Sequence, residues 1–185
     1  MSTFLETQKL VPLAEIRRTR ALLPNARGIY GLFFKVAPGT APIGNCYVRE
    51  GLHLLYVGTA GADLSKDGTL RKRLGSQHLG GNERRSTVCL TLAACLPDIA
   101  GPAIAKNERG RIKFHTSEHG ITGLRSWMDH NMSACWIEHQ SPAELEETLV
   151  QQYRPPLNID FSTHPFAVRL QALRDERRRS CVNHE

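Results

Sequence analysis

Alternating apolar residues mark three segments of the chain as strands. In residues 27–36, RGIYGLFFKV, β-branched and aromatic residues alternate so that Tyr30, Leu32 and Phe34 share one face. Residues 53–59 and 133–138 have the same character, and the first two strands can pair as a hairpin with a long connection. We therefore expect an α/β protein with a small, mainly antiparallel three-stranded sheet.

Apolar residues at helical spacing predict helices around these strands. Residues 86–96 fit a buried helix, although their β-branched start leaves a strand open, and residues 97–117 show no period. Ser141, Pro142 and Glu144 form the sequence signature of a capping box, and the helix that it opens ends before Pro155. The other expected helices cover residues 12–23, 70–79, 118–131 and about 165–179, so that helices flank the sheet and extend it at both termini.

Length and composition indicate one ordinary globular domain. The chain has 185 residues, of which 41% are hydrophobic and 23% charged, and no apolar run approaches the roughly 18 residues of a membrane span. Residues 1–18 lack the pattern of a secretory signal, and five cysteines without a C-x-x-C pair fit a reducing compartment. We expect a cytoplasmic protein with no membrane partner.

The charge permits an anionic partner. Lys and Arg number 24 against 18 Asp and Glu, for a net charge of +6, and 18 of the 24 are arginines. The planar guanidinium grips phosphate in two places, although a compositional preference for arginine codons would give the same ratio.

Five short motifs then occur in a fixed order: Gly28-Ile29-Tyr30, Tyr56-Val57-Gly58, the segment 70–74 (LRKRL), Glu146 and Asn158. This set resembles the GIY-YIG nuclease superfamily, in which two tyrosine motifs on neighbouring strands precede an arginine helix, a glutamate helix and an asparagine. The resemblance covers residues 27–160, and it leaves residues 161–185 as a basic C-terminal helix and tail.

Helical geometry selects the glutamate. At about 100° per residue, Leu145, Leu149, Val150 and Tyr153 fall within an arc of about 140°. Glu146 projects near the middle of this arc, whereas Glu144 and Glu147 project outside it. A carboxylate on an inward face needs a cation, which is either a metal ion or a core arginine.

The arginine cannot be selected in this way. Arg71 and Arg73 each lie about 80° from the direction set by Leu70 and Leu74, on opposite sides. The resemblance favours Arg73 as the phosphate-binding residue. Many relatives place a histidine four residues after this arginine, whereas this chain has Gln77 there and His78 next to it, so a catalytic His78 requires that Gly75 disturb the helix.

The resemblance implies a divalent-metal-dependent DNA endonuclease. Tyr30 would be the general base toward water, with its pKa lowered from its usual value near 10 by an arginine and a dication. Tyr56 would hydrogen-bond the water or the base, and His78 could accept the tyrosine proton. Glu146 would hold one Mg²⁺ or Mn²⁺ ion. Asn158 would complete the catalytic set, although an asparagine after two prolines could also cap a turn.

Further basic residues are candidates for contacts with the DNA backbone, namely Arg71, Lys72, Lys106, Arg109, Arg111, Lys113 and the run 174–179. A solvated charged face is the common alternative for such runs. Three alternatives stay open: an RNA-directed nuclease, a non-cleaving nucleic-acid-binding module of a larger assembly, and a homodimer in place of a monomer.

Overall fold

The central element of the structure is an antiparallel sheet of five strands. The computed structural model describes residues 3–62, 68–108, 111–180 and 182–183. The strand order is β1 (Val11–Pro12), β7 (Met132–Glu138), β2 (Gly28–Phe34), β4 (Leu52–Ala60) and β3 (Val48–Arg49). The three expected strands form its centre. The expected number of strands was wrong, because each edge carries a further strand of two residues, which is too short for an alternating pattern.

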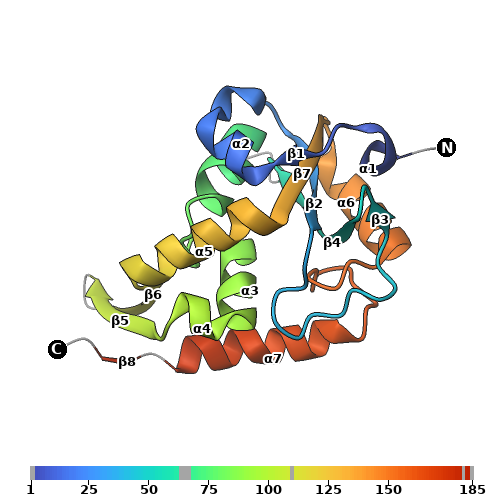
Figure 1. Ribbon diagram of the computed structural model, residues 1–185. Helices are drawn as coiled ribbons and strands as arrows, with labels where there is room; N and C mark the ends of the chain where they lie inside the picture. Colours follow the sequence, from blue (N-terminus) through green and yellow to red (C-terminus); the bar gives the residue numbers. More distant parts are fainter. Residues whose placement is uncertain (1–2, 63–67, 109–110, 181, 184–185) are drawn as a thin grey trace.

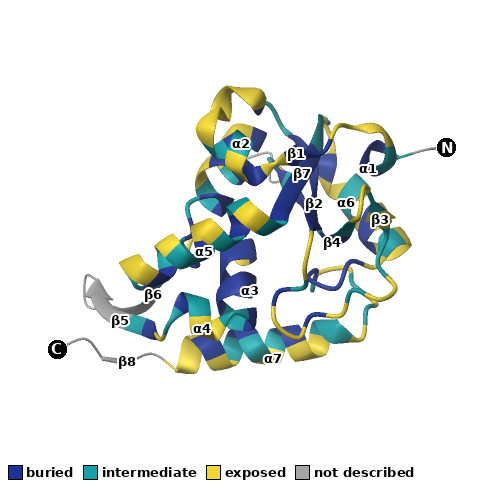
Figure 2. Ribbon diagram, in the orientation of Figure 1, coloured by how far each residue is buried: buried dark blue, intermediate teal, exposed yellow. Residues whose placement is uncertain are grey.

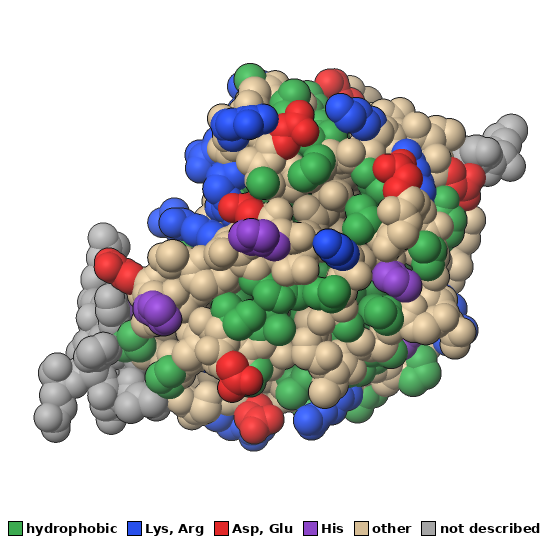
Figure 3. Space-filling view, in the orientation of Figure 1, with side chains coloured by type: hydrophobic (Ala, Val, Ile, Leu, Met, Phe, Trp, Pro, Cys, Tyr) green, Lys and Arg blue, Asp and Glu red, His purple; other side chains and the backbone are tan. Residues whose placement is uncertain are grey.

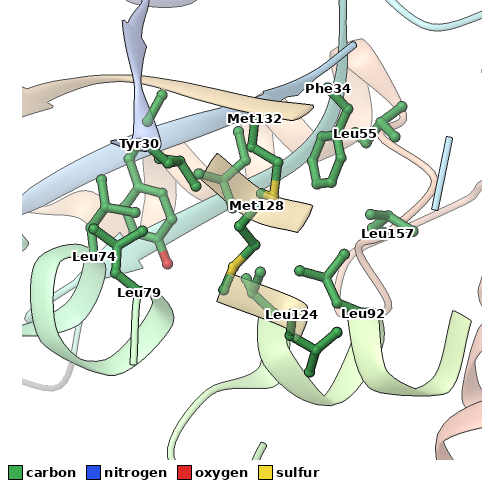
Figure 4. Packing of buried hydrophobic residues seen from close by; sticks show 14 of the residues in the cluster. Tyr30, Phe34, Leu55, Leu74, Leu79, Leu92, Leu124, Met128, Met132 and Leu157 are labelled. Atoms are coloured by element: carbon green, nitrogen blue, oxygen red, sulfur yellow. The ribbon is translucent and has the colours of Figure 1, made fainter. Parts of the chain in front are cut away.

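Strand β2 separates two apolar layers. All seven of its residues are buried. Tyr30, Leu32 and Phe34 enter the larger layer, as the alternation predicted, while Ile29 and Phe33 face the smaller one. Figure 4 shows Tyr30 at the edge of the larger layer, beside Leu74 and Leu79, so that its hydroxyl lies where the apolar packing ends.

Most helices lie where the periodicity predicted them. Figures 1 and 2 show buried α3 between α5 and α7. The bounds are α1 (Phe4–Thr7), α2 (Leu13–Arg18), 3-10 helix η1 (Arg20–Leu22), π-helix η2 (Arg71–His78), α3 (Thr87–Cys95), α4 (Pro97–Ala100), α5 (Glu118–Asn131), α6 (Pro142–Tyr153) and α7 (Phe166–Arg179).

Two of the expected helices differ in detail from the structure. The segment expected as one helix over 12–23 is broken at Thr19, where the backbone leaves the helical conformation, and Leu23 beyond this break is buried in the core. Basic side chains of this region gather at the upper left of the face shown in Figure 3, around α2. Helix α6 does begin after Ser141, but the Ser141 side chain makes no cap hydrogen bond, so the capping box was wrong.

The segment 97–117 is not irregular. After α4 it forms an antiparallel hairpin of β5 (Ala103–Glu108) and β6 (Arg111–Thr116), and β8 (Val182–Asn183) pairs with β5 in a second, three-stranded sheet. Residues 111–116 do alternate in sequence, RIKFHT, but residues 103–108 do not, which hid the hairpin. No helix in the described part of the chain is long and apolar enough to cross a membrane.

Buried arginines attach α7 to the rest of the protein. The Arg177 guanidinium forms a salt bridge with Glu83, Nε to Oε2 3.0 Å, and also donates to the Gly101 carbonyl. Arg174 donates to the Thr91 hydroxyl on α3 with its Nε at 2.9 Å. Both arginines are buried, so the expectation that the whole run 174–179 faces DNA was wrong for these two.

This ion pair yields a stability prediction. Glu83→Gln leaves the buried Arg177 charge without its counter-charge, and we expect it to lower the free energy of unfolding by about 3 kcal/mol. Asp175→Asn, which breaks the exposed Arg178 pair on the same helix, should cost much less, because water screens exposed ion pairs. Urea unfolding of both variants measures the difference, and equal losses would contradict the burial argument.

Candidate active site

The two tyrosines of the motifs lie next to each other on the larger apolar layer. Tyr30 pairs with Gly58 across β2 and β4, and the ring centroids of Tyr30 and Tyr56 are 6.3 Å apart. A Cβ on Gly58 would lie 2.6 Å from both Tyr30 Oη and Tyr56 Cε1. Glycine is therefore required at this position because the two rings occupy the space above it.

A β-bulge brings Tyr56 to this face. Leu32 pairs with Tyr56 but Phe33 pairs with Leu54, so Leu55 is the extra residue of β4. Strict alternation would put Leu55 and Tyr56 on opposite faces, yet both contact the larger layer. The bulge thus re-aims Tyr56 toward Tyr30.

Asn158 holds the open edge of β4 beside this bulge. Its Oδ1 accepts from the Val57 amide at 2.9 Å, and its Nδ2 donates to the Val57 carbonyl at 2.8 Å. The Leu157 amide donates to the Leu55 carbonyl at 3.0 Å. The Asn158 amide thus acts as a neighbouring strand would, and it fixes the backbone between Tyr56 and Gly58.

Helix η2 explains why a histidine five residues after Arg73 can reach the site. It is a π-helix, with i→i+5 hydrogen bonds such as Leu79 N–H to the Leu74 carbonyl, 3.2 Å. Residues five apart are therefore separated by one turn. The His78 ring meets Tyr30, with Nε2 2.5 Å from Tyr30 Oη, and both side chains are buried.

The two arginines of η2 have different surroundings. Arg73 is half-buried, hydrogen-bonds Tyr30, and donates through Nη1 to Gln77 Oε1 at 2.9 Å. Arg71 is exposed, and its Nε donates to the Leu23 carbonyl at 2.9 Å. Only Arg73 contacts the tyrosine, whereas Arg71 ties the start of η2 to the N-terminal segment.

Burial governs the protonation of Tyr30 and His78. Burial raises the pKa of Tyr30 well above its usual value near 10, although the Arg73 charge and hydrogen bond oppose it. The expectation of a lowered Tyr30 pKa is therefore wrong for the protein without bound ions or substrate. Burial, and then Arg73, lowers the pKa of His78 well below its usual value near 6.5. At neutral pH the pair is a neutral phenol beside a neutral imidazole.

Glu146 reaches the site from α6, on the other side of the sheet. It is half-buried whereas Glu144 and Glu147 are exposed, as the helical arc predicted. Its Oε2 accepts from the Thr59 hydroxyl at 3.1 Å, and among the described residues it has no salt bridge. Burial raises the pKa of Glu146, and nearby Asp160 adds to this, while Thr59 and Arg73 lower it.

The sequence did not single out several residues around the site. Ser86 contacts the His78 ring, Thr59 holds Glu146, and a hydrogen bond from Thr87 lowers the otherwise raised pKa of Tyr56. Short polar residues of this kind give no periodic signal, although Ser86 is the first residue of the helix predicted over 86–96.

The predicted DNA-contacting residues are distributed differently. Lys72 lies beside Arg73 at the site, whereas Arg111 and Lys113 lie on β6, in the part of that strand whose side chains are outside the described structure. Arg109 lies outside the described residues.

The structure thus places two tyrosines, an arginine, a histidine and a glutamate around the strands β2 and β4. The profile of the GIY-YIG catalytic domain matches residues 28–176, which is most of the chain. The protein belongs to the GIY-YIG family, whose members are generally endonucleases. No curated protein and no solved structure matches the chain.

The glycine requirement can be tested directly. Gly58→Ala inserts a methyl group against both tyrosine rings, and we expect a loss of about 1–3 kcal/mol in the free energy of unfolding. Gly44→Ala is the matched control, because its Cβ would meet no atom within 4 Å. Thermal unfolding compares the two, and equal stability would show that the rings can move aside.

Buried neutral His78 predicts a pH dependence of stability. In the unfolded chain a histidine gains a proton below about pH 6.5, whereas folded His78 resists protonation, so stability falls as the pH drops below 6.5. The contribution is at most about 1.4 kcal/mol per pH unit. Urea unfolding between pH 5 and 7 should show a shallower slope for His78→Gln than for the exposed control His119→Gln. Identical slopes would contradict the prediction.

Proposed function

We propose that the protein is a divalent-metal-dependent endonuclease that hydrolyses phosphodiester bonds in DNA. The observation that carries this proposal is the contact of Tyr30 with both Arg73 and His78 at the strand edge that Glu146 also reaches. A neutral acid–base pair, a phosphate-binding cation and a carboxylate are the groups that hydrolysis of a phosphodiester needs.

Each residue has a distinct role in this proposal. Tyr56, the more exposed tyrosine, orients the attacking water. Tyr30 takes a proton from that water while its own proton passes to His78. Arg73 binds the phosphate oxygens and stabilises the charge that develops at phosphorus. Asn158 positions Tyr56 through the backbone of Val57 and does not itself meet the substrate.

The donor set fits one Mg²⁺ or Mn²⁺ ion at Glu146. Its carboxylate is half-buried and forms no salt bridge among the described residues, burial raises its pKa, and oxygen is the donor that these ions prefer. Among the described residues no three His, Cys, Asp or Glu side chains form a metal-binding group, so water and phosphate oxygens would complete the coordination. When bound, the ion would stabilise the leaving 3′ oxygen.

Basic hollows beside Arg73 support a nucleic-acid substrate. A hollow of about 410 Å³ is lined by Lys72, Arg73 and Arg85. An adjoining one of about 450 Å³ is lined by Arg73, Arg85, Arg84 and Arg178. Because both share Arg73, a bound backbone can place one phosphate at the tyrosines and others along this surface.

The proposal also covers the bounds of the catalytic core and the cellular compartment of the nuclease. We assign residues 27–160 to the catalytic core and residues 161–185 to a C-terminal extension, of which α7 packs against α3. The four described cysteines are free, which supports a reducing compartment such as the cytoplasm. Nothing in the described residues supports a homodimer, so none is proposed.

A plasmid-nicking assay tests the proposal. Wild-type protein with Mg²⁺ should nick supercoiled DNA, and Glu146→Gln should lower the rate at least about 100-fold while DNA affinity is retained, because the ion loses its protein carboxylate. Glu147→Gln, on the exposed face of the same helix, should cut at the wild-type rate.

Three results would contradict parts of this proposal. Equal loss in both glutamate variants would contradict the placement of Glu146. Cleavage of RNA in preference to DNA in the same assay would reassign the substrate. DNA binding without cleavage at any Mg²⁺ or Mn²⁺ concentration would make the protein a binding module.

A further inference from the structure

A chain of buried hydrogen bonds continues beyond the catalytic pair. His78 Nε2 is 2.5 Å from Tyr30 Oη, and its Nδ1 is 2.5 Å from Ser86 Oγ. Ser86 Oγ also accepts from the Cys89 amide at 3.0 Å, as the N-cap of α3. Tyr30, His78 and Ser86 are each no more than 2% exposed. Both ring nitrogens of His78 therefore have a protein partner, and water is largely excluded from the ring itself.

A neutral imidazole carries one proton, so the chain can run in only two directions. In one, Tyr30 donates to Nε2, and Nδ1–H donates to Ser86 Oγ. In the other, Ser86 donates to Nδ1, and Nε2–H donates to Tyr30 Oη. In each direction one hydroxyl proton has no acceptor within this chain of hydrogen bonds. The free-energy cost of that unmatched donor decides between the two directions.

The left-over proton is better placed on Ser86 than on Tyr30. Ser86 lines the basic hollow, where water can accept its hydroxyl proton. Tyr30 has no exposed surface, and its neighbour Arg73 is a donor only. Because an unmatched buried donor is costly, the first direction is favoured, with both lone pairs of Ser86 Oγ in use.

We propose that Ser86 is a positioning residue that holds His78 with its proton on Nδ1, so that Nε2 is free to accept the proton of Tyr30. The inference rests on the proposed nuclease function and names a residue that this function did not include. In the step itself, the Tyr30 O–H bond breaks and an N–H bond forms at His78 Nε2. The resulting imidazolium donates to Ser86 Oγ and to the phenolate oxygen.

The first turn of α3 fixes this arrangement from a second point. Cys89 Sγ donates to the His78 carbonyl at 3.0 Å, while the Cys89 amide holds Ser86 Oγ. The end of η2 and the start of α3 are thus joined through both the ring and the backbone of His78. The serine hydroxyl is consequently fixed in direction, as a group that selects a tautomer must be.

Nitrogen NMR of histidine-labelled protein tests the tautomer without any need for activity. The His78 signals, assigned by their loss in His78→Gln, should show a protonated Nδ1 and an unprotonated Nε2 in the wild type. The same pattern should persist in Tyr30→Phe, because Ser86 sets it. It should be lost in Ser86→Gly, which keeps a residue favourable at a helix N-cap. A protonated Nε2 in the wild type, or an unchanged pattern in Ser86→Gly, would overturn the inference.

Kinetics supply the second readout. In the nicking assay Ser86→Gly should lower kcat about 10- to 100-fold with little change in KM, and Ser86→Thr should restore most of it, since threonine keeps the hydroxyl. Ser117→Ala is the matched control, because Ser117 Oγ caps α5 through the Gly120 amide, also at 3.0 Å, but among the described residues forms no hydrogen bond with a histidine. An equal loss of kcat in Ser117→Ala would reduce Ser86 to a helix cap. A wild-type protein with the expected tautomer but no nicking would overturn the proposed function and support the Ser86 assignment.

Discussion

The buried hydrogen bond between Tyr30 and His78 is the constraint around which the site is arranged. It joins the central strand β2 to helix η2, and neither side chain has access to bulk water. A histidine at this sequence position reaches the tyrosine only because η2 is wound with i→i+5 hydrogen bonds. Strand, π-helix and the start of α3 must therefore keep one relative position for the bond to exist.

Buried charge is used in two ways in this protein. Arg177 and Glu83 neutralise each other, and Arg174 is held by Thr91, so these groups fix α7 on the core. Glu146 differs, because in the described part of the chain its half-buried carboxylate has a hydroxyl partner but no salt bridge, and Arg73 acts on it only through its charge. A half-buried carboxylate whose charge is not neutralised destabilises the folded state, and such residues are typical of ligand-binding and catalytic sites.

How much the sequence could predict depended on whether a feature follows a regular period. The inward face of β2 and the position of Glu146 on α6 follow periods of 2 and 3.6, and both were predicted correctly. The same arithmetic could not choose between Arg71 and Arg73, because both lie about 80° from the apolar direction of an α-helix, and η2 is in fact a π-helix. The β-bulge at Leu55 was not predictable either, since it depends on pairing between strands.

Residues that act through hydrogen bonds could not be predicted from the sequence for a different reason. Ser86 and Thr59 are short polar side chains whose partners lie 8 and 87 positions away in the chain. Asn158 was selected by resemblance alone, and its binding to the Val57 backbone is a tertiary contact that no local pattern encodes. Burial likewise raises the Tyr30 pKa in the protein without bound ions, and this effect was absent from the sequence argument, which considered only an arginine and a dication.

Arg73 gives the pair a dependence on substrate. Its charge lowers the pKa of Tyr30, which favours the phenolate, and it also lowers the pKa of His78, which disfavours the imidazolium. In the free protein, burial and the lowering of the His78 pKa by Arg73 keep the proton on Tyr30. In the proposed reaction a phosphate bound to Arg73 neutralises part of that charge and weakens both effects, so the imidazolium becomes less costly and the phenolate more costly. The same guanidinium that binds the phosphate thus acts on both partners of the proton transfer, and the two actions oppose each other.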